Sequence, residues 1–154
     1  MTQSTTHIEE TAQKVRQHLE KTDQKFLSLL GITNDEVKPD YARCSMAVRE
    51  DMLNTGRVCH GGFIFFLADN AFAYACLSSN RLGATLSAHI MYTQGAKLGE
   101  RLTATAQMIT SGNRTGTCDV EVTNPVGDVV ARYQGVWYRM NGMLVEEERH
   151  ADEH

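Results

Sequence analysis

The sequence predicts an α+β fold in which one antiparallel β-sheet wraps around a long central helix, with an extra helix at the N-terminus. Three observations predict it: a helical period over the first 30 residues, an almost wholly apolar segment near residues 61–79, and four alternating apolar and polar segments after it. A helix that is apolar on every side must be buried on every side, and the alternating segments are the strands that can enclose it.

Length and composition indicate one globular domain. The chain has 154 residues, 42% of them hydrophobic and 22% charged, and its 15 basic and 19 acidic side chains give a net charge of −4. We expect a helical extension over residues 1–35, a single domain over 36–142, and an acidic, unpatterned tail over 143–154.

Charge and hydropathy exclude several classes of function. The net negative charge argues against a nucleic-acid partner, and the lack of 18 consecutive apolar residues argues against a membrane span. The first residues, MTQSTTHIEETAQK, lack the basic-then-apolar order of a secretory signal, so we expect a cytoplasmic protein.

The first half of the chain is expected to hold two elements before the apolar segment. A helix is predicted from Thr6 to Leu30, because its apolar residues fall near one face, and Gly31 is its expected stop. A strand is predicted from Tyr41 to Val48, where the side chains alternate with a period of two. The Asn, Thr and Gly residues between Asp51 and Val58 indicate a loop.

The apolar segment is predicted to be a helix from about Gly61 to Ser79. In its core, FIFFLADNAFAYACL, thirteen of fifteen residues are apolar, and the exceptions are Asp69 and Asn70. Ala, Leu and Phe dominate, β-branched residues are scarce, and the run is too long for an ordinary strand.

Four strands are predicted after this helix, and the links between the last three are short. Such links favour antiparallel pairing, since a parallel crossover needs a dozen residues or more. The expected strands are Ala84–Gln94, Glu100–Thr110, Thr115–Asn124 and Asp128–Met140.

Cysteines and histidines do not form a recognisable metal motif. The four cysteines contain no C-x-x-C pair and the six histidines no cluster, so we expect neither a metal site nor a cofactor. Cys59 and His60 are adjacent, but neighbouring side chains seldom point at each other and no third orienting group is evident. A Cys–His nucleophile is therefore disfavoured.

Asp69 is the candidate for chemistry. A carboxylate inside an apolar helix is costly unless it is paired, hydrogen-bonded or protonated. Either a neighbouring element satisfies it as part of the architecture, or it is a nucleophile or general base kept in apolar surroundings.

The start of the same helix is a candidate anion site. The segment Cys59-His60-Gly61-Gly62 places two glycines where the first-turn amides lack internal partners. Glycine allows a substrate oxygen to approach these amides, although a glycine-rich turn into a packed helix would look the same. Eight residues separate Gly61 from Asp69, about 12 Å along a helix. If both act on one carbonyl, we expect them to come from two subunits of a dimer.

Several motifs resemble one known family. Residues 52–54 (MLN), 59–62 (CHGG), 67–76 (LADNAFAYAC) and 115–124 (TGTCDVEVTN) resemble the phenylacetate-degradation, or PaaI-type, acyl-CoA thioesterases of the hotdog fold. The resemblance spans roughly residues 40–140.

The resemblance implies hydrolysis of acyl-CoA thioesters, with an aryl or medium-chain acyl group such as phenylacetyl, by a homotetramer built from dimers. Gly61 would polarise the thioester carbonyl through its amide, and Asp69 of the partner subunit would attack it or activate water. Asn54 and His60 would shape the catalytic site. The positions expected to bind substrate are Gly62, Thr85, Ser87, Lys97 and Arg114.

One departure from the family pattern and two alternatives remain. Where phenylacetate-pathway members carry Arg-Pro-Gly after the strand that follows the helix, this chain has Thr93-Gln94-Gly95-Ala96, which leaves the grip on the coenzyme and phenylacetyl specificity open. A hydratase or dehydratase of the same fold would use His60 as its base. A non-catalytic acyl-CoA-binding module would need neither residue for chemistry.

Overall fold

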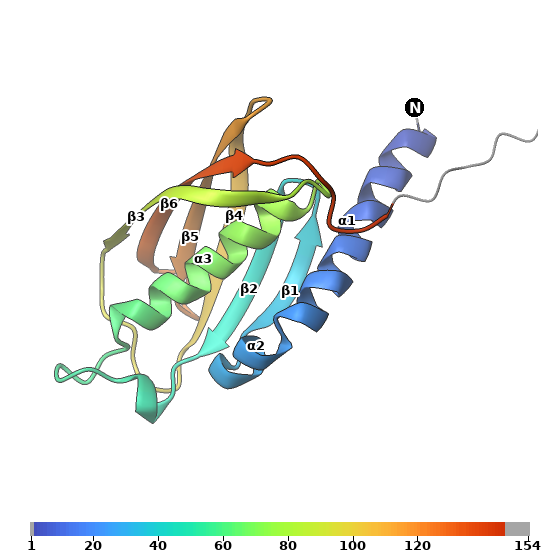
Figure 1. Cartoon of the computed structure of the whole chain (residues 1–154). Helices are drawn as coiled ribbons and strands as arrows, with labels where there is room; N and C mark the ends of the chain where they lie inside the picture. The colour runs from blue at the N-terminus through green and yellow to red at the C-terminus, as the bar shows by residue number, and fades with distance from the viewer. Residues whose placement is uncertain (1, 147–154) are drawn as a thin grey trace, which may run out of the picture.

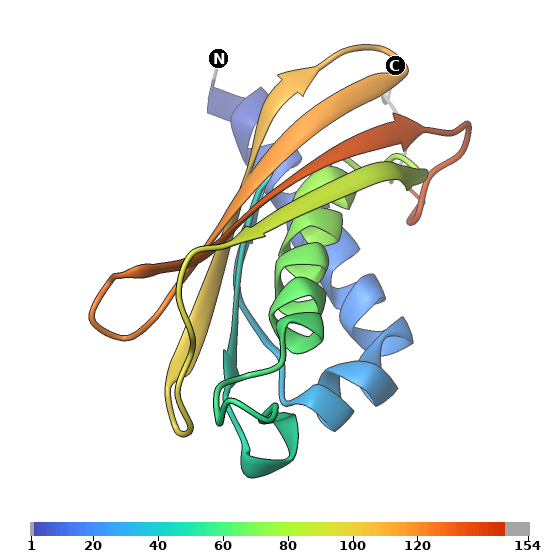
Figure 2. The ribbon, with the colours of Figure 1, turned by 90° about the vertical axis from the view of Figure 1, so that its left-hand side faces the viewer.

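The protein folds as one curved antiparallel sheet around a single long helix (Figures 1 and 2). The structure is a computed structural model that describes residues 2–146, so residues 147–154 of the expected acidic tail lie outside the described residues. The sheet has six strands in the order β1-β2-β4-β5-β6-β3, and the central helix α3 spans Gly61–Leu77. The predicted α+β architecture is confirmed.

The strands after α3 lie where the alternating pattern places them, each within two residues of its predicted bounds. The hairpin turns join β4 to β5 and β5 to β6 as antiparallel neighbours, while β3 pairs with β6 at the edge. The six strands of the sheet are β1 (Thr33–Lys38), β2 (Tyr41–Ala47), β3 (Gly83–Tyr92), β4 (Arg101–Ser111), β5 (Thr115–Thr123) and β6 (Val129–Arg139).

The N-terminal segment forms two helices, so the single helix predicted from Thr6 to Leu30 is wrong in its continuity. Helix α1 spans Thr2–Thr22 and α2 spans Gln24–Leu30. Asp23 between them has ψ near 0°, outside helical geometry, and its Oδ2 accepts a 3.2 Å hydrogen bond from the Tyr74 hydroxyl of α3. Gly31 ends α2 in the left-handed region with φ of 66°, as predicted.

Strand β1 (Thr33–Lys38) was not predicted. It pairs with β2 at one edge of the sheet, and the expected domain boundary after residue 35 falls inside it. Helix α1 covers this edge: the Gln13 side chain donates a 2.6 Å hydrogen bond to the Val37 carbonyl, and Arg16 donates to the Asn34 carbonyl. Two carbonyls of this edge strand thereby receive hydrogen bonds from helix side chains.

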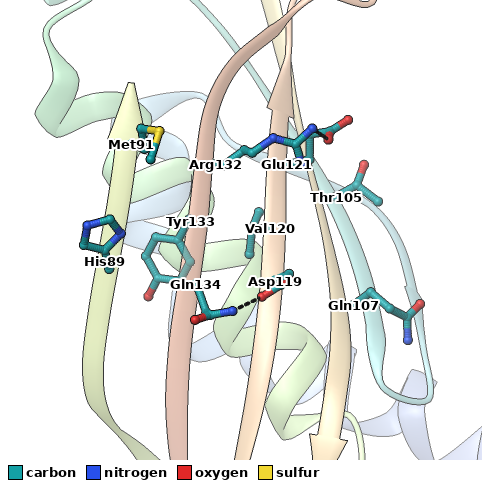
Figure 3. A pocket seen from close by; sticks show the side chains of 10 residues that line it. All are labelled: His89, Met91, Thr105, Gln107, Asp119, Val120, Glu121, Arg132, Tyr133 and Gln134. Atoms are coloured by element: carbon teal, nitrogen blue, oxygen red, sulfur yellow. Dashed lines mark hydrogen bonds and ion pairs between the residues drawn. The ribbon is translucent and has the colours of Figure 1, made fainter. Parts of the chain in front are cut away.

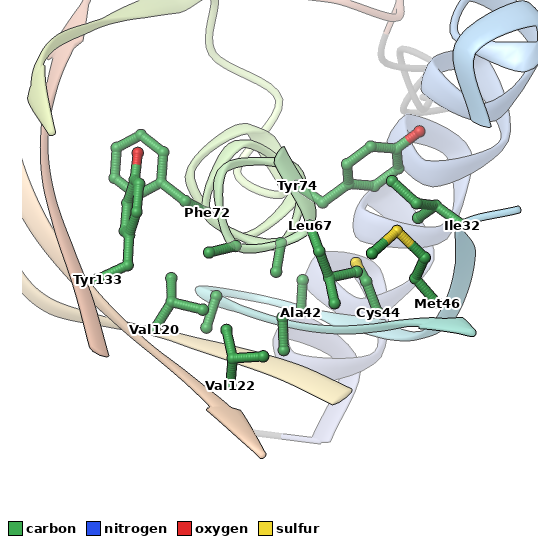
Figure 4. Close-up of a cluster of buried hydrophobic side chains, with 14 of the residues drawn as sticks. Ile32, Ala42, Cys44, Met46, Leu67, Phe72, Tyr74, Val120, Val122 and Tyr133 are labelled. Atoms are coloured by element: carbon green, nitrogen blue, oxygen red, sulfur yellow. The ribbon is translucent and has the colours of Figure 1, made fainter. Parts of the chain in front are cut away.

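Helix α3 packs its apolar side chains against the concave face of the sheet (Figure 4). Leu67, Phe72 and Tyr74 are at most 1% exposed, among side chains from β2, β5 and β6. Burial on every side, however, is not reached in the single chain. Gly62 and Phe66 are exposed and Asp69 and Ala73 are partly exposed, and these positions form one stripe along the helix.

Residues 48–60 join β2 to α3 and contain the loop predicted between Asp51 and Val58. This connection contains one 3₁₀ turn, Glu50–Met52, and an isolated bridge between Leu53 and Cys59. No helix within residues 2–146 combines the length and the apolarity needed to cross a bilayer.

Candidate active site

The first turn of α3 presents one uncommitted amide. His60 is the N-cap residue, and its Nδ1 accepts a 3.0 Å hydrogen bond from the Gly62 N–H. The Phe63 N–H donates to the His60 carbonyl at 3.0 Å. Within residues 2–146, no acceptor is recorded for the Gly61 N–H. The Gly61 amide is thus the donor that remains for a ligand at this helix N-terminus.

A tyrosine from β3 holds Gly61 in place. The Tyr92 hydroxyl donates a 2.8 Å hydrogen bond to the Gly61 carbonyl, and a Cβ at position 61 would lie 2.9 Å from the Tyr92 ring. The close approach of this ring explains why glycine occupies the position. It also places the end of β3 against the start of α3.

Asn54 orders the loop that leads into α3. Its Oδ1 accepts hydrogen bonds from the N–H groups of Gly56 at 2.9 Å and Val58 at 3.3 Å. Two further backbone bonds, from Cys59 to the Ala96 carbonyl and from His60 to the Met52 carbonyl, fix the end of the loop. The recorded bonds of the Asn54 side chain thus lie within its own loop.

Asp69 lies two turns further along α3 and has one engaged oxygen. Its Oδ1 accepts a 2.6 Å hydrogen bond from the Tyr133 hydroxyl of β6. For Oδ2, no partner is recorded among the described residues, and the side chain is partly exposed. The carboxylate is therefore only half satisfied by its own chain, unlike a purely architectural buried aspartate.

Tyr133 is the site residue that the sequence analysis missed. Burial is the main cause that raises the pKa of this phenol far above its usual range, and the hydrogen bond to Asp69 adds to it. The alternation of β6 predicts that Tyr133 faces the helix, but no sequence signal identifies which helix residue it meets.

An apolar groove opens beside the N-terminus of α3. It lies between α2 and α3, has a volume of about 490 Å³, and is called the α2–α3 groove below. Phe26 of α2 and Phe66 of α3 form its aromatic wall, with ring centroids 5.4 Å apart at an angle of 64°. The other lining residues are Leu29, Leu30, His60, Gly62 and Phe63.

The remaining predicted site residues are spread over the molecule. Thr85 pairs with the buried Trp137 and so lies on the α3 face of the sheet, whereas Ser87 pairs with Val136 after a register shift and lies on the outer face. Lys97 directly follows Ala96, whose carbonyl contacts the loop before α3. Arg114 lies in the β4–β5 turn, at the other end of the sheet from the 50–60 loop (Figure 2). Arg114 is thus not brought near Gly61 within one chain.

A second, polar groove lies on the outer face of the sheet (Figure 3). Its volume is about 600 Å³, and it runs across β3, β6, β5 and β4. Arg132 pairs with Glu121 at 2.9 Å, and Gln134 donates a 2.7 Å hydrogen bond to Asp119. The sheet separates this groove from the Gly61 amide and the α2–α3 groove.

The cysteines are buried and poorly suited to nucleophilic chemistry. Burial raises the pKa of Cys59 to about 11 and that of Cys44 to about 12. The nearest recorded partner of Cys59 Sγ is the His60 carbonyl, not the imidazole. Among the described residues, no three His, Cys, Asp or Glu side chains gather as a metal-ligand set.

The chain is similar to known thioesterases in both sequence and structure. The family model for the thioesterase superfamily matches residues 56–131. Acyl-coenzyme A thioesterase PaaI of Escherichia coli is 37% identical over 118 residues, which cover 77% of this chain and 84% of that protein. The structure of E. coli PaaI, from the phenylacetic acid degradation operon, has a TM-score of 0.85 and covers 88% of this chain and 98% of its own, at 33% identity.

Two further similar proteins come from distant organisms. Human acyl-coenzyme A thioesterase 13 is 31% identical, with 86% of this chain and 91% of that protein covered. A Streptococcus mutans protein, smu.793, solved with bound acetyl CoA, has a TM-score of 0.69 at 26% identity and covers 73% of this chain and 90% of its own.

The buried thiols lead to a first prediction. At pH 8 a thiol with a pKa of about 11 is about one part in a thousand thiolate, so Ellman's reagent should label Cys59 slowly in the folded protein. All four cysteines should react quickly once guanidinium unfolds the chain. Rapid labelling of one thiol in the folded protein, abolished by Cys59→Ser, would contradict this prediction and revive the Cys–His nucleophile.

Proposed function

This chain belongs to the thioesterase superfamily as a PaaI-type member with the hotdog fold, and on that premise we propose that it hydrolyses acyl-coenzyme A thioesters to free acids and coenzyme A. The observation that carries the proposal is the pair of groups on α3: the open Gly61 amide at its first turn, and Asp69 with one uncommitted oxygen two turns later.

The two groups divide the work of thioester hydrolysis. The Gly61 N–H, reinforced by the helix dipole, donates to the carbonyl oxygen and stabilises the negative charge that develops there. Asp69 Oδ2 either attacks the carbonyl carbon or takes a proton from the attacking water. If Asp69 attacks, the acyl group passes to its carboxylate as an anhydride when the carbon–sulfur bond breaks, and water then hydrolyses the anhydride and regenerates Asp69. If Asp69 acts as base, water adds directly to the carbonyl carbon and the carbon–sulfur bond then breaks. In both routes the thiolate of coenzyme A leaves and is protonated, and water supplies the oxygen of the free acid.

Replacing Asp69 by Asn tests this role. The amide keeps the shape and can still accept the Tyr133 hydrogen bond, but it cannot act as nucleophile or base, so the hydrolysis rate should fall about 100- to 10,000-fold. Thiol release from a panel of acyl-CoAs measures the rate, and calorimetry measures acyl-CoA binding, which should persist. Asp128→Asn in the β5–β6 turn is the matched control and should leave the rate unchanged.

Other outcomes would point to the alternatives. Unchanged hydrolysis by Asp69→Asn would overturn the proposal. A greater loss from His60→Ala, with hydration of an unsaturated acyl-CoA in place of thiol release, would favour the hydratase. Binding without thiol release by the wild-type chain would favour the non-catalytic module.

The site is proposed to be shared between two subunits. About 12 Å of helix separates Gly61 from Asp69, too far for both to contact one carbonyl. The sheet also has one uncovered edge: α1 protects β1, but no described element covers β3. Strand β3 carries no Lys, Arg, Asp, Glu or Pro, the residues that usually discourage edge pairing. A second copy paired at β3 would complete the sheet and bring a second α3 beside the first.

Mixing two inactive variants tests the shared site. Gly61 is the first residue of α3, where proline is tolerated, and His60 has a ψ of 133°, which suits the residue before a proline. Gly61→Pro therefore removes the amide donor, and Gly61→Ala is its control because it adds a similar Cβ near Tyr92 but keeps the N–H. The proline variant should be much less active than the alanine variant.

Refolding Gly61→Pro together with Asp69→Asn should restore about a quarter of wild-type activity, because half of the dimers are mixed and each has one intact site. Native mass spectrometry verifies the mixed dimers and also tests the homotetramer, a dimer of such dimers, that the family resemblance implies. Verified mixed dimers without activity would place both groups in one subunit.

The acyl group is proposed to occupy the α2–α3 groove. This groove begins at His60 and Gly62, beside the open amide, and its walls are almost wholly apolar. An aryl group such as phenylacetyl, or a medium-length alkyl chain, matches such walls, because apolar surface gains free energy on leaving water. Lys97 near the same helix end is the proposed contact for a coenzyme phosphate. Arg139 is buried and already bonded to Gly112 and Ser111, so it is not a candidate.

Leu29→Gln tests the acyl site. Leu29 lines the groove and is 72% exposed, so its replacement should not unfold the protein. The preference for phenylacetyl-CoA or octanoyl-CoA over acetyl-CoA, measured as the ratio of kcat/KM values, should fall about 3- to 10-fold. Val126→Gln, at an apolar position in the β5–β6 turn that is 80% exposed, should leave the ratio unchanged. Equal effects of the two substitutions would contradict the placement of the acyl group.

A further inference from the structure

The side chain of Asp69 is tied to β6 through one short contact. The Tyr133 hydroxyl donates a 2.6 Å hydrogen bond to Oδ1, across 64 residues of sequence. A charged acceptor makes such a bond about twice as strong as a neutral pair. One carboxylate oxygen is thereby fixed, and the other is left uncommitted.

The Tyr133 ring is itself clamped by two phenylalanines of α3. Phe65 and Phe72 lie four residues before and three residues after Asp69, so all three fall on the helix face toward β6. The ring centroids of Phe65 and Phe72 are 5.5 and 5.4 Å from that of Tyr133, in tilted or edge-to-face geometry. Gly135 leaves room for Phe72, because a Cβ there would lie 2.4 Å from its ring. The phenol thus has little freedom to move.

The hydroxyl also keeps its proton. Burial raises the pKa of Tyr133 well above that of an ordinary tyrosine, and the neighbouring carboxylate adds to the effect. The phenol therefore stays protonated near neutral pH and can donate its hydrogen to Asp69.

We propose that Tyr133 is the positioning residue for Asp69: by holding Oδ1 it aims Oδ2 at the reacting carbon or water. This inference rests on the proposed thioesterase function. Without the hydroxyl, the carboxylate would rotate about its side-chain bonds and spend less time in the reactive geometry. Substrate binding, which uses the α2–α3 groove and the Gly61 amide, would not change.

The chain contains a matched control for this contact. On another side of α3, the Tyr74 hydroxyl donates a 3.2 Å hydrogen bond to Asp23 Oδ2, and Tyr74 is buried like Tyr133. Tyr133→Phe and Tyr74→Phe each remove one oxygen from a buried tyrosine that is bonded to an aspartate. Any general effect on packing or stability is therefore common to both variants.

The test compares kcat, KM and melting temperature for the two variants on one acyl-CoA. Tyr133→Phe should lower kcat about 10- to 100-fold, the rate change that corresponds to the free energy of a hydrogen bond to a charged group. KM should stay within about twofold of wild type. Tyr74→Phe should lower the melting temperature but leave kcat unchanged. In the Asp69→Asn background, Tyr133→Phe should cause no further loss of rate, because Tyr133 acts only through Asp69.

Each contrary result has a distinct meaning. An unchanged kcat in Tyr133→Phe, with Asp69→Asn inactive, would overturn the positioning role and leave the thioesterase intact. Equal losses of kcat in the two tyrosine variants would show that Tyr133 has only a structural role. A wild-type chain inactive on every thioester would overturn the proposed function and this inference together.

Discussion

Enclosing helix α3 is the constraint on which the rest of this structure depends. The helix is apolar around almost its whole circumference, so water must be removed from nearly every side of it. The curved sheet does this on the concave face, and α1 and α2 lie along the open side (Figure 2). Details of the sheet follow from the same need. Position 135 is glycine because the Phe72 ring occupies the space that a side chain would take.

Two adjacent polar residues on α3 meet that constraint in opposite ways. Successive residues on a helix point about 100° apart, so Asn70 faces β1 and β2 while Asp69 faces β6. Asn70 is buried, and its amide donates to Asn34 and to the Cys44 sulfur at 3.0 and 3.2 Å, which joins the helix to the sheet. Asp69 keeps one oxygen without such a partner among the described residues. Asn70 is therefore architectural, and Asp69 is available for chemistry.

The sequence predicts the elements whose burial pattern is strong and misses those set by distant contacts. Helix α3 follows from an apolar run of helix-forming residues that is too long for a strand, and the last four strands follow from their alternation. The sequence of strand β1 is mostly polar, because β1 is an edge strand on which only Asn34 and Val37 are buried, so it lacks the alternation that identifies a strand. The break at Asp23 carries no proline or glycine signal. Asp69 is recognisable in the sequence as a charge in an apolar helix, and Gly61 as part of a glycine pair at the helix start. Tyr133 has the pattern of any inward-facing strand residue, and only the folded structure shows its contact with Asp69.

Two surfaces of the single chain are left uncovered by its described elements, and one of them contains Asp69. The exposed stripe of α3, which includes Phe66 and Asp69, and the uncovered edge of β3 both leave apolar or hydrogen-bonding groups facing water. Exposed apolar surface and an unpaired strand edge both favour association, so covering them would lower the free energy of the folded chain. In the proposed dimer, a second copy would cover both surfaces and would lie beside the partly exposed Asp69. The proposed shared site follows from the same surfaces: about 12 Å of helix separates Gly61 from Asp69 within one chain, and pairing at β3 would bring the Gly61 amide of one copy toward the Asp69 carboxylate of the other.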